Sequence, residues 1–121
     1  MSAFLVGLSW RDPEEVAAFV RIGLDDDSRC ATGIFIVAEN KTVALSWGTE
    51  ICKRYLDFLF ANKNYRFEEL EIFCWVEEDP QKSSWTHCLD FFPRVQVGQN
   101  PEFQKMTADA YSDWCKKAGI S

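Results

Sequence analysis

The residue types best suited to catalysis gather in Thr86-His87-Cys88-Leu89-Asp90. A cysteine nucleophile needs a base within hydrogen-bond reach of its thiol, and His87 is the only histidine in the chain. Segment 85–92 has a strand-like pattern, and neighbouring side chains of a strand point to opposite faces of the sheet. The strand would separate His87 from Cys88, so we expect no catalytic dyad between them. Three other thiols stay open as partners of His87 through the fold: Cys30, Cys52 and Cys115.

Carboxylates are concentrated in segment 66–79, which carries a net charge of −5 because its six acidic residues face one basic residue. They are interleaved with aromatic residues. Paired carboxylates can catalyse acid–base chemistry or bind a divalent metal, but Glu77-Glu78-Asp79 lacks the spaced ligands of a calcium loop. We therefore expect either a solvated acidic face or a surface that binds a basic protein, with Trp75 or Trp85 as its aromatic anchor.

A second acidic cluster, Asp25-Asp26-Asp27, follows the first predicted helix and is expected to form an exposed loop. If it lay beside Glu77-Glu78-Asp79, the combined carboxylates would resemble the charge of a phosphate backbone. The sequence alone does not bring the two clusters together. Both are retained as candidate partner-binding residues.

The cysteine pattern argues against disulfides and against a metal centre. The five cysteines are an odd number, and no two of them are spaced as CxxC. We expect free, mostly buried thiols in the reducing cytoplasm. A glycine-rich phosphate loop, GxSxG, HExxH and a dinucleotide-binding fingerprint are all absent. No cofactor and no metal are therefore expected, and the chain is not expected to be an enzyme.

Charge and length limit the classes of partner. The 121 residues include 19 acidic and 13 basic ones, for a formal charge of −6, which disfavours nucleic acids and anionic membranes. No apolar run is long enough to span a bilayer, and Met1–Phe4 is interpreted as the start of a strand rather than a signal peptide. The length predicts one domain over residues 1–121.

Hydrophobic periodicity predicts an α+β fold with the order β-α-β-β-α-β-β-α. The predicted strands are 3–10, 31–38, 42–47, 70–77 and 85–92, with a β-hairpin over 31–47 and a possible extension through Val95 and Val97. The predicted helices run from Asp12-Pro13 to Gly23, from Thr49 to Asn62, and from an N-cap at Asn100 to a C-terminal Gly119. The first six elements match the order of the ferredoxin-like split βαβ fold. We expect an antiparallel or mixed sheet of about five strands, with the three helices on one face.

In size, acidic charge and lack of catalytic motifs, the chain is similar in kind to small acidic inhibitors. These include immunity proteins that neutralise toxic bacterial nucleases or deaminases, and phage anti-defence proteins. The resemblance implies a rigid scaffold whose carboxylates face a basic partner, such as a toxin or nuclease.

Two alternatives remain open. The chain could be a small-ligand-binding or enzymatic α+β domain with a pocket near His87. It could also self-associate, as a homodimer, through the aromatic side chains of segment 70–77. A concave pocket at His87 favours the first alternative, whereas an acidic patch with exposed tryptophan favours the inhibitor.

Overall fold

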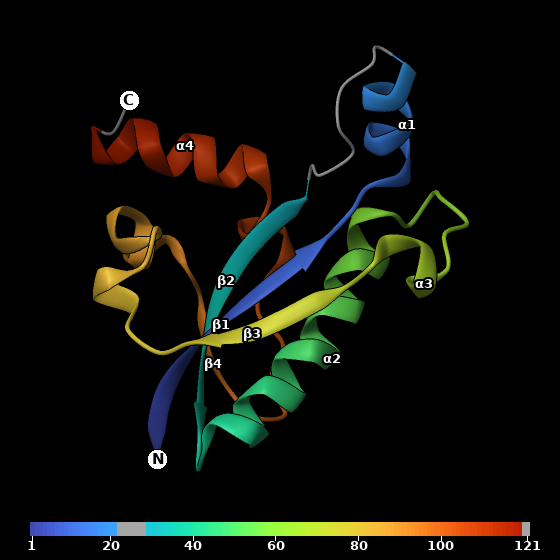
Figure 1. Ribbon diagram of the computed structural model, residues 1–121. Coiled ribbons are helices and arrows are strands. Elements are labelled where there is room, and N and C mark those ends of the chain that lie inside the picture. Colours follow the sequence, from blue (N-terminus) through green and yellow to red (C-terminus); the bar gives the residue numbers. More distant parts are fainter. Residues whose placement is uncertain (22–28, 120–121) are drawn as a thin grey trace.

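A four-stranded mixed sheet organises the computed structural model, which describes residues 1–21 and 29–119 (Figure 1). Its strand order is β3-β1-β2-β4. Strand β1 (Ser2–Trp10) pairs antiparallel with β2 (Cys30–Ala38) and with β3 (Phe73–Glu77). Strand β4 (Arg94–Gln96) is short and pairs parallel to β2. The fold is therefore α+β, as predicted, but the sheet has four strands instead of about five.

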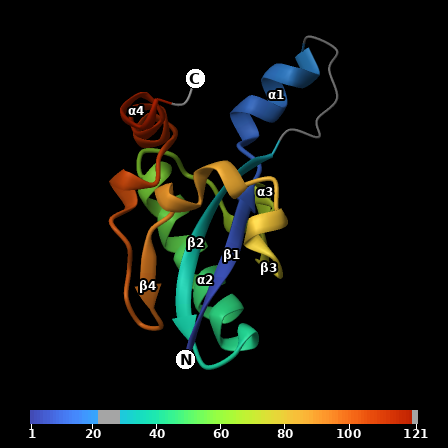
Figure 2. The same cartoon turned by 90° about the vertical axis from the view of Figure 1, so that its left-hand side faces the viewer.

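The long helix α2 (Lys41–Leu59) covers one face of the sheet (Figures 1 and 2). The fully buried side chains between them come from alternate positions of β1 and β2 and from one side of the helix: Val6, Leu8, Ile34, Ile36, Ile51, Cys52 and Leu56. Within the helix, position 48 is a glycine, and Val6 of β1 packs directly against it. A Cβ atom at Gly48 would lie 2.6 Å from Cγ1 of Val6.

The predicted strand 42–47 is wrong, and so is the hairpin over 31–47, because 42–47 forms the first turns of α2. The helix begins at the N-cap Asn40, whose side chain accepts a hydrogen bond of 2.9 Å from the backbone N–H of Val43. That segment also alternates apolar and polar residues, which misled the strand prediction. The ferredoxin-like order is not confirmed, since it needs a strand at this position.

The predicted strand 85–92 is also wrong. The 3-10 helix η2 (Thr86–Phe91) occupies this region, following the shorter η1 (Pro80–Lys82), and both lie over the sheet face opposite α2 (Figure 2). Only the extension predicted through Val95 is extended, as β4. The second sheet face is thus covered by irregular chain, with Leu5, Cys88 and Phe92 buried beneath it.

Three further α-helices and one 3-10 helix complete the described chain. Helix α1 (Pro13–Arg21) follows β1, and the single-turn α3 (Phe67–Leu70) precedes β3. Helix α4 (Ala108–Ala118) begins later than predicted, after Thr107, and the short η3 (Phe103–Lys105) precedes it. Its C-terminal end agrees with prediction, because Gly119 adopts a left-handed φ of 74°.

No helix within residues 1–21 and 29–119 combines the length and the apolar character needed to cross a membrane.

Candidate functional site

Aromatic side chains of β3 occupy the sheet face opposite α2. Residues Phe73, Trp75 and Glu77 point to this face, as the alternation of segment 70–77 predicts, while Cys74 and Val76 pack toward α2. The Trp75 indole lies directly over Gly7 of β1, where a Cβ atom would come within 2.3 Å of the ring. The missing side chain therefore lets the indole lie flat on the sheet.

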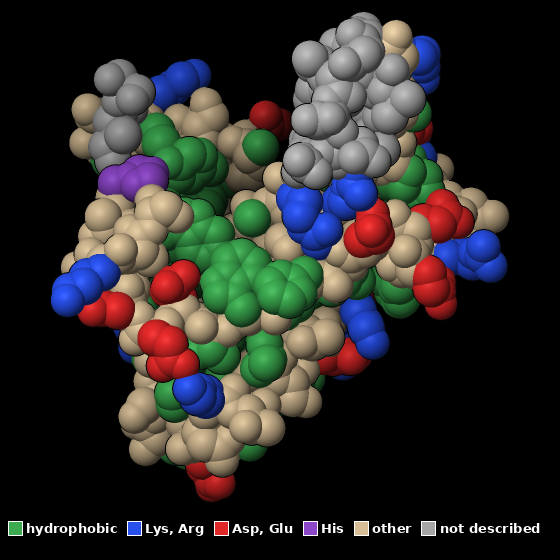
Figure 3. All heavy atoms as spheres, in the orientation of Figure 1, with side chains coloured by type: hydrophobic (Ala, Val, Ile, Leu, Met, Phe, Trp, Pro, Cys, Tyr) green, Lys and Arg blue, Asp and Glu red, His purple; other side chains and the backbone are tan. Residues whose placement is uncertain are grey.

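Three aromatic rings on this face form a stack that we call the aromatic strip: Phe73 and Trp75 of β3, and Trp85 just before η2. The Phe73 and Trp75 rings are 5.8 Å apart with an interplanar angle of 22°, and the Trp75 and Trp85 rings are 5.6 Å apart at 29°. Trp85 then meets Phe92 edge-on at 5.2 Å. Phe73 is 60% exposed, and both tryptophans are half-buried. Figure 3 shows hydrophobic side chains gathered across the middle of this face.

The structure brings three of the predicted partner-binding residues together: Trp75, Trp85 and Glu77. The indole N–H of Trp75 donates to Oε2 of Glu77 over 3.3 Å. The neighbouring carboxylates form ion pairs, Glu78 with Lys41 at 2.5 Å and Asp79 with Lys82 at 4.0 Å. Both pairs are exposed and contribute about 0–1 kcal/mol, so they can be exchanged for a partner's cations.

The second acidic cluster, Asp25-Asp26-Asp27, lies outside the described residues. Its position relative to Glu77-Glu78-Asp79, which the sequence left open, is therefore not tested by the described residues.

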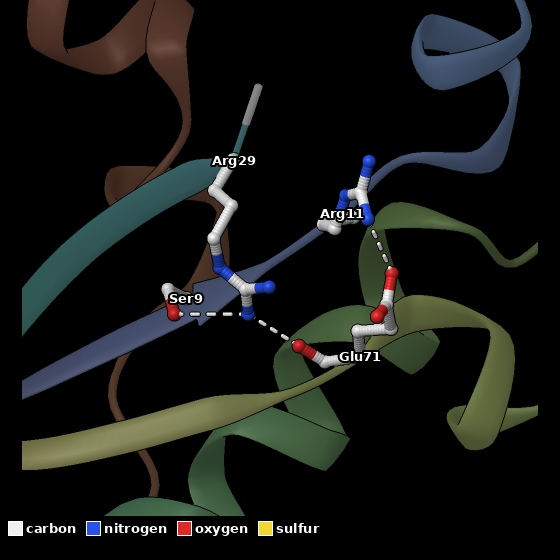
Figure 4. Close-up of polar contacts among 4 residues, drawn as sticks. All are labelled: Ser9, Arg11, Arg29 and Glu71. Carbon is white, nitrogen blue, oxygen red and sulfur yellow. Dashed lines mark hydrogen bonds and ion pairs between the residues drawn. The ribbon is translucent and has the colours of Figure 1, made fainter. Parts of the chain in front are cut away.

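The opposite end of the aromatic strip is cationic (Figure 4). The guanidinium of Arg11 pairs with the Glu71 carboxylate at 2.8 Å. Arg29 donates to the backbone carbonyl of Glu71 and, over 3.2 Å, to the hydroxyl of Ser9, which in turn donates to the Phe73 carbonyl over 2.8 Å. These bonds tie β1, the start of β2 and β3 together. Sequence reasoning counted Glu71 in an acidic face and had no signal for its left-handed backbone, φ 46°.

A cleft of about 550 Å³ lies beside the aromatic strip. It is bounded by the start of β2, the end of α2, η2 and the start of α4, and its lining is mainly aromatic and aliphatic. The polar side chains at its walls include Asp12, His87 and Tyr111. No lysine or arginine is among the described residues that line it.

His87 and Cys88 both reach this cleft, which the strand interpretation did not anticipate. Nε2 of His87 lies 3.3 Å from the hydroxyl of Tyr111, within hydrogen-bond distance, so its described partner is a phenol rather than a thiol. Burial raises the pKa of the Cys88 thiol. A hydrogen bond with Cys115, together with burial, raises the pKa of Tyr111. Neither shift favours an activated nucleophile, which needs a lowered pKa or an adjacent base.

A second pair of thiols lies on the other side of the sheet, where Cys52 of α2 meets Cys74 of β3. The hydrogen bond from Cys52 lowers the pKa of Cys74 to about 7, and the same contact raises the pKa of Cys52. None of the five cysteines, all of which lie within the described ranges, forms a disulfide. Within the described ranges, no group of three or more His, Cys, Asp or Glu side chains is placed to hold a metal ion.

No family model matches this chain, and the searches of curated proteins and of solved structures likewise found no match.

Proposed function

We propose that this chain is a non-catalytic protein-binding inhibitor that neutralises a basic partner, such as a toxin or nuclease, in the cytoplasm. The observation that carries the proposal is the aromatic strip, in which the exposed Phe73 extends a stack of two tryptophans beside Glu77. Large rings held on a rigid sheet lose little conformational freedom on binding, and such rings dominate the energetics of protein interfaces.

The charges beside the aromatic strip support a partner with basic groups. Glu77, Glu78 and Asp79 follow one another at the end of β3, and the whole chain carries a charge of −6. Carboxylates at the rim of an interface mainly accelerate encounter with a cationic partner. The basic groups of the partner are expected to face Glu77, since the other end of the strip carries Arg11 and Arg29.

The test needs a partner recovered by pull-down with the purified chain. Association and dissociation rates are then measured at two salt concentrations. Truncation of Phe73 to alanine is expected to speed dissociation at least tenfold, because the ring would be an anchor buried by the partner. The matched control is Phe67→Ala in α3, since Phe67 is also exposed but is not in the aromatic strip.

Charge reversal tests the rim separately. The double variant Glu77→Lys and Glu78→Lys is expected to slow association and to reduce its dependence on salt, with a smaller effect on dissociation. His87→Gln should leave both rates unchanged. If the reversed variant and Phe73→Ala both bind like the wild-type chain, the aromatic strip is not the binding surface. Loss of a dimer in the Phe73→Ala variant, measured by analytical ultracentrifugation, would instead assign the strip to self-association.

A second candidate function, ligand binding in the cleft at His87, is favoured by the size and lining of that cleft. Its volume lies within the ~300–1,000 Å³ usual for ligand sites, and apolar side chains dominate its walls. The raised pKa of Cys88 favours binding over nucleophilic catalysis in this cleft.

A further inference from the structure

One edge of β2 is only partly paired. Along its other edge, β2 pairs with β1 over its full length, from Cys30 to Ala38. Strand β4 pairs with β2 only at residues 35–37. Among the described residues, no strand pairs with this edge of β2 between Cys30 and Ile34.

The hydrogen-bond pattern shows which backbone groups point to the open edge. The N–H of Phe35 donates over 2.9 Å to the carbonyl of Pro93, the residue before β4, so the backbone of Phe35 faces away from β1. Backbone groups alternate in direction along a strand. The N–H and C=O groups of Gly33 and Ala31 therefore point to the same edge, where β4 does not reach; Gly33 is buried beneath the Phe92 ring, whereas Ala31 is exposed.

The cleft begins at this edge. Cys30, Ala31 and Thr32 form part of its lining, and Tyr111 of α4 and Phe91 of η2 contribute to the lining as well. A ligand in the cleft thus meets two kinds of surface together: apolar side chains and a strand edge with outward backbone donors and acceptors.

We propose that the cleft binds an extended polypeptide segment, which adds to the open edge of β2 beside Ala31. A polypeptide supplies the alternating N–H and C=O groups that a strand edge accepts, and its alternate side chains enter the apolar cleft. This inference rests on the second candidate function, ligand binding in the cleft, whose lining shares Trp85 with the aromatic strip but does not include Phe73 or Trp75.

Charge selects a segment that carries a basic residue. Asp12 lines the cleft, and its Oδ1 accepts a hydrogen bond of 2.9 Å from the backbone N–H of Glu14. Lys63 interacts electrostatically with Asp12, but its ion pair is with Glu14. With no described lysine or arginine in the lining, a lysine or arginine of the bound segment is expected near Asp12.

The experiment uses a phage-displayed library of random heptapeptides as its probe, selected on the immobilised full chain. Recovered peptides are synthesised, and each backbone N–H is replaced in turn by N-methyl. Strand addition predicts that every second N-methyl group weakens binding about tenfold, while the intervening ones change it less than twofold. Equal effects at successive positions, or no peptide enriched over a surface without the protein, would overturn the proposal.

Variants of the chain locate the site. Ala31→Pro removes the outward N–H and is expected to weaken peptide binding about tenfold more than the matched Ala31→Val, which keeps that N–H. Asp12→Asn keeps an acceptor for Glu14 and should abolish the preference for a basic residue. Phe73→Ala should not change peptide binding, so failure here is distinguishable from failure of the aromatic strip. Equal binding by Ala31→Pro and Ala31→Val would contradict strand addition.

Discussion

Gly7 of β1 lies directly opposite Gly33 of β2, and each glycine is covered by an aromatic ring from a different segment. The Trp75 indole lies over Gly7, and Phe92 packs over Gly33, where a Cβ atom would come within 2.8 Å of its ring. Two adjacent strands therefore offer a shallow floor without side chains. This floor brings β3 and the segment after η2 close enough for Trp75, Trp85 and Phe92 to contact one another in series.

Replacing Gly7 by alanine should disturb the aromatic strip. The new methyl group would overlap the Trp75 ring, so we expect a loss of about 1–3 kcal/mol in the free energy of unfolding in urea. The near-ultraviolet circular dichroism of the stacked tryptophans should change as well. The double variant Gly7→Ala with Trp75→Leu should lose less unfolding free energy than the sum of the losses in the two single variants. Additive losses would show that the indole does not rest on Gly7.

A strand could be predicted from alternating side chains where its two faces meet different surroundings. In β1 and β3 one set of side chains packs on α2 and the other set meets the second layer, so period two is visible in the sequence, whereas β2 was predicted from its continuous apolar run. The aromatic strip could be predicted in part for the same reason, since Phe73 and Trp75 share a face. Its stacking on Trp85 could not, because segment 85–92 folds as 3-10 turns that no simple period describes.

The start of α2 shows how local chemistry overrides such a pattern. Val43, Leu45 and Trp47 alternate as in a strand, yet the buried positions Ala44 and Gly48 follow helical spacing. A pocket near His87 was one of the alternatives, but the boundary of the cleft could not be predicted because of both errors, since α2 and η2 each form part of it.

Removal of the Asn40 cap should therefore destabilise α2. Asn40→Ala deprives the Val43 N–H of its acceptor and is expected to cost about 1 kcal/mol of unfolding free energy. Asn40→Asp keeps the acceptor and should stay within a few tenths of a kcal/mol of the wild-type chain. Urea titration followed by far-ultraviolet circular dichroism measures both. If the alanine variant is as stable as the aspartate variant, segment 41–47 does not depend on this cap.

The bonds among Ser9, Arg29 and Phe73 should be energetically coupled. Ser9 is buried, accepts from Arg29 and donates to the Phe73 carbonyl, so Ser9→Ala removes both bonds and is expected to cost about 1 kcal/mol. Arg29→Ala removes the donors to Ser9 and to the Glu71 carbonyl. A double-mutant cycle of urea unfolding should give a coupling energy above about 0.5 kcal/mol. A coupling energy of zero would mean that Arg29 does not support the start of β3.

The contact between Cys52 and Cys74 makes a pH-dependent prediction. A thiolate at Cys74 is stabilised chiefly by the hydrogen bond from Cys52, and its pKa of about 7 lies below the ordinary value of 9.0. The Cys74 thiol loses its proton near pH 7 in the folded chain and about two pH units higher in the unfolded chain. Its contribution to stability is therefore absent below pH 7 and grows as the pH rises from 7 to 9. The raised pKa of Cys52 opposes any gain above that range.

Alkylation by iodoacetamide, followed site by site with mass spectrometry, tests this contact because only the thiolate reacts. The rate at Cys74 should rise with a midpoint near pH 7, while Cys88, whose pKa burial raises, should respond only at higher pH. Cys52→Ala removes the donor and should move the Cys74 midpoint upward, toward its ordinary value. Cys52→Ser keeps a donor of similar size, so its midpoint should stay near that of the wild-type chain. A Cys74 midpoint near pH 9 in the wild-type chain, or one unchanged in Cys52→Ala, would exclude the hydrogen bond as the cause.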